Sequence, residues 1–275
     1  MNITAADVNK LRKQTGAGMM DCKKALVEAE GDFEMAIDIL RKKGQKVAAK
    51  RSDRDAAEGV VIAQSTDDGS RGALIVLNCE TDFVAKNDDF GAVANNILRT
   101  AIENNPASLD ELKALNYPGS ELKIGDKITE EVGKIGEKIE LSAYEHISAG
   151  RVVAYNHPGN KLASIVGFNK STDDEVAKDV AMQVAAMDPV SVTKDDVPAD
   201  VVARELQVGK DQAIEEGKPA DLAEKIAQGR LNKFFKESTL LAQGFIKDGK
   251  KSVDQYLKEK DNDLTVTEFK RIALS

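Results

Sequence analysis

Residues 59–77, GVVIAQSTDDGSRGALIVL, decide the fold class because two apolar runs lie on either side of a turn. The runs at 59–63 and 73–77 are rich in β-branched residues and have the length of strands. Residues 67–70, DDGS, have the composition of a turn. The second run has no polar residue, which predicts a strand buried on both faces.

The same pattern returns later in the chain. Residues 150–155 and 162–166 predict two further strands, separated by a turn at 156–160. Each pair of strands is followed by apolar residues at helical spacing. We therefore predict a duplicated strand–strand–helix core, in which the first copy holds extra residues around 79–86. Two unrelated α+β halves are the alternative.

Helical patterns occupy the region before the first strand and a segment after the second copy. Residues 4–43 predict three short helices, broken near 15–18 and 31–32. Residues 45–56 are crowded with Lys and Arg and predict an exposed basic linker. Residues 199–237 predict a helical hairpin, and the polar tail beyond it contains a short strand candidate at 264–266. The predicted fold class is α+β.

Composition excludes several classes of protein. The 275 residues carry a net charge of −8, and aromatic residues make up only 4 % with no Trp. This balance argues against a general nucleic-acid binder, which needs a cationic face. No apolar run reaches the length of a membrane span, and the N-terminus has no signal-peptide pattern. We expect a reduced, cytoplasmic protein with two free thiols, Cys22 and Cys79.

Sequences that resemble catalytic motifs are incomplete. Residues 244–251, GFIKDGKK, approach a P-loop but end in Lys where Ser or Thr is required. Cys79 lacks an obvious base, and the histidines at 146 and 157 have no metal-ligand spacing. We therefore predict no enzymatic activity, cofactor or metal, although catalytic groups can converge from distant positions.

Two longer motifs resemble the signatures of the elongation factor Ts family. They are TGAGMMDCKKAL at 15–26 and NCETDFVAK at 78–86, and the similarity runs in register from Ile3 to about Leu257. The resemblance implies guanine-nucleotide exchange on elongation factor Tu during translation elongation in protein biosynthesis. The implied partner is elongation factor Tu, both GDP-bound and nucleotide-free, without direct contact to nucleic acid or membrane. It also allows a homodimer within a complex with the partner.

The resemblance gives the predicted parts their roles. On this resemblance, residues 1–44 would form a three-helix partner-docking domain similar to a ubiquitin-associated domain, and 45–56 would form the basic linker. Core subdomain one spans 57–143, and core subdomain two spans 144–275 with the hairpin. Members of the family continue with a further terminal helix, so the chain departs from that pattern after Ser275.

The resemblance also implies site residues. A loop that dislocates magnesium on the partner would consist of Thr81, Asp82, Phe83 and Val84. Partner-binding residues would be Arg12, Met19, Met20, Lys23, Ile135, His157 and Ile246. From the residues alone, a core position is favoured for both Phe83 and Met20, and the resemblance reverses that interpretation.

Two rival functions remain. A ubiquitin-associated-like adaptor without exchange activity would use only residues 4–43 and would leave the core at 57–190 unexplained. A thiol or acid–base enzyme in the core is the second.

Overall fold

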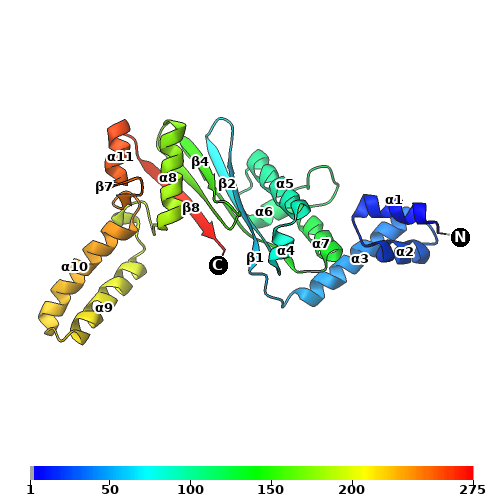
Figure 1. Ribbon diagram of the computed structural model, residues 1–275, viewed down its shortest axis with the longest axis horizontal. Helices are drawn as coiled ribbons and strands as arrows, with labels where there is room; N and C mark the ends of the chain where they lie inside the picture. The colour runs from blue at the N-terminus through cyan, green and yellow to red at the C-terminus, as the bar shows by residue number, and fades with distance from the viewer. Residues whose placement is uncertain (1–2, 275) are drawn as a thin grey trace. The chain divides into compact units, whose positions relative to one another are not determined.

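The structure is a computed structural model that describes residues 3–274, coloured along the chain in Figure 1. Three residues lie outside the described range: Met1 and Asn2, which begin the predicted docking domain, and Ser275, which ends the predicted second core subdomain. The chain divides into two compact units. Unit one comprises residues 3–62, 75–144 and 273–274, and unit two comprises 63–74 and 145–272.

Unit one begins with the predicted three-helix bundle (Figure 1). Helix α1 (Ala5–Thr15) starts at a capping box formed by Thr4 and Asp7, and α2 (Met19–Glu28) follows a short connection. Asp32 caps α3 (Phe33–Arg51) by accepting from the Met35 backbone N–H. Gly16 closes α1 with φ of 69°, a left-handed conformation that glycine adopts without steric cost. The core of the bundle contains Val8, Leu11, Cys22, Ala25, Leu26, Ala29 and Ala36.

Helix α3 is longer than the sequence predicts. The helix includes residues 45–51, the first part of the segment predicted as an exposed basic linker. The reason is packing against α7 (Ile124–Ile135), which the sequence reading did not identify. The helices approach at Gly44 and Gly133, where a Cβ on Gly133 would lie 2.6 Å from Gly44 Cα.

The first copy of the module contains β1 (Glu58–Ser65), β2 (Arg71–Cys79) and α5 (Asp88–Asn104). The one-turn helix α4 (Asp82–Ala85) lies between β2 and α5. β2 is buried along nearly its whole length, as its unbroken apolar run predicts. A third strand, β3 (Ile139–Ser148), completes a sheet with the order β1-β2-β3, while α6 (Leu109–Ala114) and α7 precede it in the chain.

The second copy lies in unit two. Strands β4 (Arg151–Asn156) and β5 (Leu162–Phe168) pair antiparallel, with Arg151 opposite Phe168 and Asn156 opposite Ala163. Helix α8 (Asp174–Met187) packs on both strands, so the predicted strand–strand–helix order is confirmed in both copies. Strand β8 (Val266–Ala273) completes a sheet with the order β4-β5-β8.

The predicted helical hairpin is confirmed as α9 (Ala199–Glu215) and α10 (Ala220–Ser238), whose arms lie side by side in Figure 1. A short 3-10 helix, η1 (Lys194–Asp196), precedes the hairpin. The remaining elements of unit two are β6 (Gly244–Phe245), β7 (Asp248–Ser252) and α11 (Val253–Lys260).

The polar tail is more ordered than the sequence predicts. The strand expected at 264–266 is the start of β8, which continues to Ala273, and α11 precedes it. Tyr256 of α11 stacks on Phe245 with ring centroids 4.1 Å apart, and this contact attaches α11 to the core of unit two. Within residues 3–274, the helices lack the combination of length and apolar composition needed to cross a bilayer.

Candidate functional site

The segment that interrupts the first copy of the module carries an exposed aromatic ring. Phe83 lies on α4 and is 83 % exposed, whereas Phe90 at the start of α5 is 2 % exposed. The alternative of a core position for Phe83 is therefore wrong. The hydroxyl of Thr81 caps α4 by accepting from the Val84 backbone N–H, so a defined helical turn presents the ring.

A carboxylate fixes the first residue of this loop. Glu137, in the connection between α7 and β3, accepts a hydrogen bond from the Thr81 backbone N–H at 3.1 Å. Its other oxygen accepts from the Thr81 hydroxyl at 2.8 Å. Because both bonds go to a charged acceptor, they are stronger than bonds between neutral groups. The base of the loop is therefore held in one orientation while Phe83 extends into solvent.

Asp82 forms an ion pair within its own helical turn. The Lys86 ammonium donates to Asp82 Oδ2 at 2.7 Å, and this hydrogen bond lowers the pKa of Asp82 below its usual value. The pairing is local and exposed. Such a pair contributes little to stability and can be exchanged for a contact with another charged group.

The thiol beside the loop is poorly suited to nucleophilic chemistry. Cys79 is fully buried at the end of β2, and its Sγ donates to the Thr81 carbonyl oxygen at 3.1 Å. Burial raises the pKa of Cys79 to about 11, with the Glu137 carboxylate adding to the shift. The thiol therefore stays protonated near neutral pH, which removes the main support for a thiol enzyme.

The predicted docking residues of the bundle flank the connection between α1 and α2. Met19 and Met20 open α2 and are 52 % and 62 % exposed, so the core alternative for Met20 is also wrong. Arg12, in the last turn of α1, and Lys23, one turn into α2, are exposed as well. Two flexible apolar side chains and two cations thus lie at one end of the bundle, a composition suited to protein recognition.

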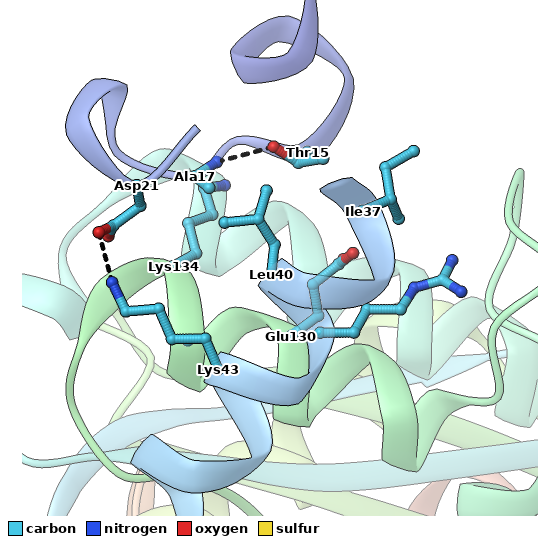
Figure 2. A pocket seen from close by; sticks show the side chains of 10 residues that line it. Thr15, Ala17, Asp21, Ile37, Leu40, Lys43, Glu130 and Lys134 are labelled. Atoms are coloured by element: carbon cyan, nitrogen blue, oxygen red, sulfur yellow. Dashed lines mark hydrogen bonds and ion pairs between the residues drawn. The ribbon is translucent and has the colours of Figure 1, made fainter. Parts of the chain in front are cut away.

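A narrow cavity lies beside the contact between the bundle and α7, and Figure 2 shows the side chains that line it. Its volume is about 30 Å³, which is room for water but far below the size of a small-molecule site. Lys134 of α7 reaches the bundle here, and a Cβ on Gly16 would lie 2.8 Å from its Cε. On the bundle side, Lys43 of α3 pairs with Asp21 of α2.

The remaining predicted site residues lie in three places. Ile135 is half-buried at the end of α7, two residues before Glu137. His157 is exposed in the turn between β4 and β5, where its Nδ1 lies 3.1 Å from the Tyr155 hydroxyl. Ile246 is 42 % exposed at the tip of the β6–β7 hairpin. That hairpin includes residues 244–251, so the P-loop-like sequence does not form a strand–loop–helix site.

The sequence analysis assigns no role to Glu137, which binds Thr81, or to Arg51, which donates to Glu80 beside the loop. Glu137 and Arg51 occur in no motif, and Glu80 belongs to the second motif without an assigned role. In the part of the chain that the structure describes, no three His, Cys, Asp or Glu side chains are grouped as metal ligands would be.

Comparisons with known proteins identify the family to which the chain belongs. The family model described as Elongation factor TS matches residues 80–275. Elongation factor Ts of Christiangramia forsetii is 54 % identical over 274 residues, covering 99 % of this chain and 98 % of the relative. Elongation factor Ts of Amoebophilus asiaticus is 53 % identical over 275 residues, covering 99 % of both chains. The protein of the same name from Porphyromonas gingivalis is 50 % identical over 275 residues, covering 100 % of this chain and 99 % of its own.

By class, therefore, this is a translation elongation factor that functions in protein biosynthesis. The chain belongs to the elongation factor Ts family.

Proposed function

We propose that this protein binds elongation factor Tu and promotes release of GDP from it by disturbing the partner's magnesium and phosphate site. The observation that carries the proposal is Phe83, an aromatic side chain 83 % exposed on a capped helical turn. Large aromatic side chains supply much of the energy at protein interfaces when a partner covers them. The turn that carries the ring is ordered before binding, so its backbone loses little conformational freedom when the ring inserts into a partner.

The proposed mechanism needs no covalent step. Binding free energy and GDP affinity are linked, so a factor that weakens GDP binding is itself bound less tightly by the GDP form. Phe83 inserts into the partner and displaces the groups that hold magnesium, which loosens the phosphates. Asp82 adds a polar contact there, and water partly replaces that contact when the carboxylate is absent.

The other predicted contacts have separate roles in this proposal. Arg12, Met19, Met20 and Lys23 dock the bundle on the GTP-binding domain of elongation factor Tu, and Ile135 adds an apolar contact beside the loop. His157 and Ile246 bind elsewhere on the partner. The same protein engages the GDP-bound and the nucleotide-free partner in the cytoplasm.

The direct test of the function is the rate of fluorescent GDP release from elongation factor Tu, with and without this protein. We expect the rate to rise with concentration and then to saturate. Binding without acceleration would favour the adaptor function, which needs only the bundle.

The His157 contact has its own test. Hydrogen exchange of residues 155–161 is measured in the free protein and in the complex. We expect slower exchange in the complex because a partner that covers the β4–β5 turn excludes water from its amides. Unchanged exchange rates would remove His157 from the set of contacts.

A further inference from the structure

We propose that Arg51 and Glu80 are positioning residues that join the Phe83 loop to the helix leaving the docking bundle, so that docking sets the direction of the loop. This inference rests on the proposed exchange function and adds a coupling between its two surfaces. The residues concerned lie within unit one.

The pair joins one guanidinium nitrogen to both oxygens of a carboxylate and is partly shielded from water. Arg51 Nη1, on the last residue of α3, donates to both Glu80 oxygens, at 2.7 and 2.9 Å. The Glu80 side chain is 17 % exposed and that of Arg51 is 35 % exposed. An exposed surface ion pair typically contributes almost nothing. This one differs because both groups are charged, both Glu80 oxygens accept from Arg51 Nη1, and the Glu80 side chain is largely shielded from water.

Glu80 also accepts from the main chain. The Lys138 backbone N–H donates to Glu80 Oε1 at 2.5 Å, and this bond, together with Arg51, lowers the pKa of Glu80. The Lys138 ammonium donates in turn to the carbonyl oxygens of Ser52 and Arg54, at 3.1 and 3.2 Å. Lys138 thus binds both Glu80, which precedes Thr81, and the residues that follow α3.

The connection extends back into the bundle. Helix α3 is continuous from the bundle core to Arg51, and it meets α7 in backbone contact at Gly44 and Gly133. Two residues after α7 ends, Glu137 holds Thr81. Both helices therefore lead to a side chain that fixes the base of the Phe83 loop. A pivot between bundle and loop would require breaking these hydrogen bonds.

The coupling predicts a specific kinetic defect. Arg51→Ala removes the clamp but leaves Phe83 and the exposed docking side chains in place. We expect the maximal rate of GDP release to fall about tenfold, because small errors in the placement of a functional side chain are costly. The concentration that gives half the maximal rate should change by less than about twofold, because rigid docking contacts are retained.

The experiment uses the full chain with stopped-flow release of fluorescent GDP from elongation factor Tu. The variants are Arg51→Ala, Glu80→Gln, the double variant and the conservative Arg51→Lys. Lys50→Ala is the matched control, since Lys50 is an exposed cation one residue earlier on α3. We expect the double variant to be no slower than the slower single variant, as residues acting through one contact require. Arg51→Lys should recover part of the rate, and Lys50→Ala should match the wild type.

A second readout does not depend on exchange activity. Hydrogen exchange at residues 79–87 is followed in the free protein, and Arg51→Ala should accelerate it while melting shifts little. Wild-type maximal rates in both single variants, or rates lost only in proportion to unfolded protein, would overturn the proposal. If the wild type itself fails to accelerate release, the proposed function fails. In that case the hydrogen-exchange measurement still tests the Arg51–Glu80 contact. Unchanged hydrogen exchange at residues 79–87 in Arg51→Ala would reject it, and faster hydrogen exchange would show that the contact orders the loop without a role in GDP release.

Discussion

The two copies of the strand–strand–helix module differ most at the junction between the second strand and the helix. In the first copy, the connection at residues 80–87 contains the helical turn α4, on which Phe83 is exposed to solvent. In the second copy, residues 169–173 connect β5 to α8 without a helical turn. The Asn169 side chain binds the Asp263 carbonyl oxygen at 2.7 Å and the Thr265 backbone N–H at 3.0 Å.

The hydrogen bonds at the two junctions have different effects on the structure. Those of Asn169 attach its junction to the segment before β8, which stabilises packing within unit two. Those of Glu80 and Glu137 hold only the base of the first junction and leave its tip uncovered. The same module thus accommodates two different connections between its second strand and its helix. Of these two, the connection in the first copy exposes a large apolar side chain that a partner could cover.

The largest expected effect is a loss of stability when the buried aromatic residue of the first copy is removed. Phe90→Ala should reduce the free energy of unfolding by about 3–5 kcal/mol, because Phe90 is buried and its removal leaves a cavity. Thermal or urea denaturation measures this change. GDP release should fall only in proportion to the unfolded fraction. A stable Phe90→Ala protein would show that α5 packs differently from the structure.

Phe83→Ala should have the opposite profile. We expect stimulated GDP release to fall about thirtyfold, which corresponds to about 2 kcal/mol for an aromatic anchor at an interface. Release of fluorescent GDP at saturating protein measures the loss. An unchanged rate would mean that exposure at this junction has no role in exchange.

The third prediction concerns the docking end of the bundle. Met20→Asp should weaken binding to elongation factor Tu by about tenfold while leaving the maximal release rate largely intact. The reason is that a charge replaces an exposed, adaptable apolar side chain on the bundle and leaves the loop residues unchanged. Titration calorimetry measures the affinity. Met35→Asp is the matched control, because Met35 is 54 % exposed on the same bundle. Equal effects of the two substitutions would remove Met20 from the docking surface.

The smallest effect is expected in the second copy. Asn169→Ala should lower the free energy of unfolding by about 1 kcal/mol, because it removes two hydrogen bonds at an exposed site. Chemical denaturation measures the difference, and GDP release should match the wild type. If a folded Asn169→Ala protein failed to accelerate GDP release, the second junction would also act in nucleotide exchange, and the proposed difference between the two junctions would be wrong.

Local patterns in the sequence predict much of this architecture. Thr4 and Asp32 mark helix starts that the structure confirms, and the apolar run at 73–77 predicts the buried part of β2. The sequence analysis does not predict helix α7, although Ile124, Ile128 and Val132 have helical spacing. Its glycines weaken the pattern, and packing on α3 compensates for them.

The positioning contacts lie beyond the reach of local patterns. Arg51 and Glu80 are 29 residues apart, and Thr81 and Glu137 are 56 apart, so only the folded chain brings them together. The exposed state of Phe83 could be inferred from the interrupted repeat, but residue type alone favours burial. Sequence therefore predicts the loop, whereas the groups that hold it require the structure.

The most direct test of the account compares Phe83→Ala and Phe90→Ala in one assay. For each variant, the maximal rate of GDP release from elongation factor Tu is divided by the fraction of protein that is folded at the same temperature. We expect a corrected rate about thirtyfold below wild type for Phe83→Ala and a corrected rate near wild type for Phe90→Ala. A large drop in melting temperature for Phe83→Ala, with a corrected rate equal to wild type, would contradict it by showing that Phe83 acts in packing.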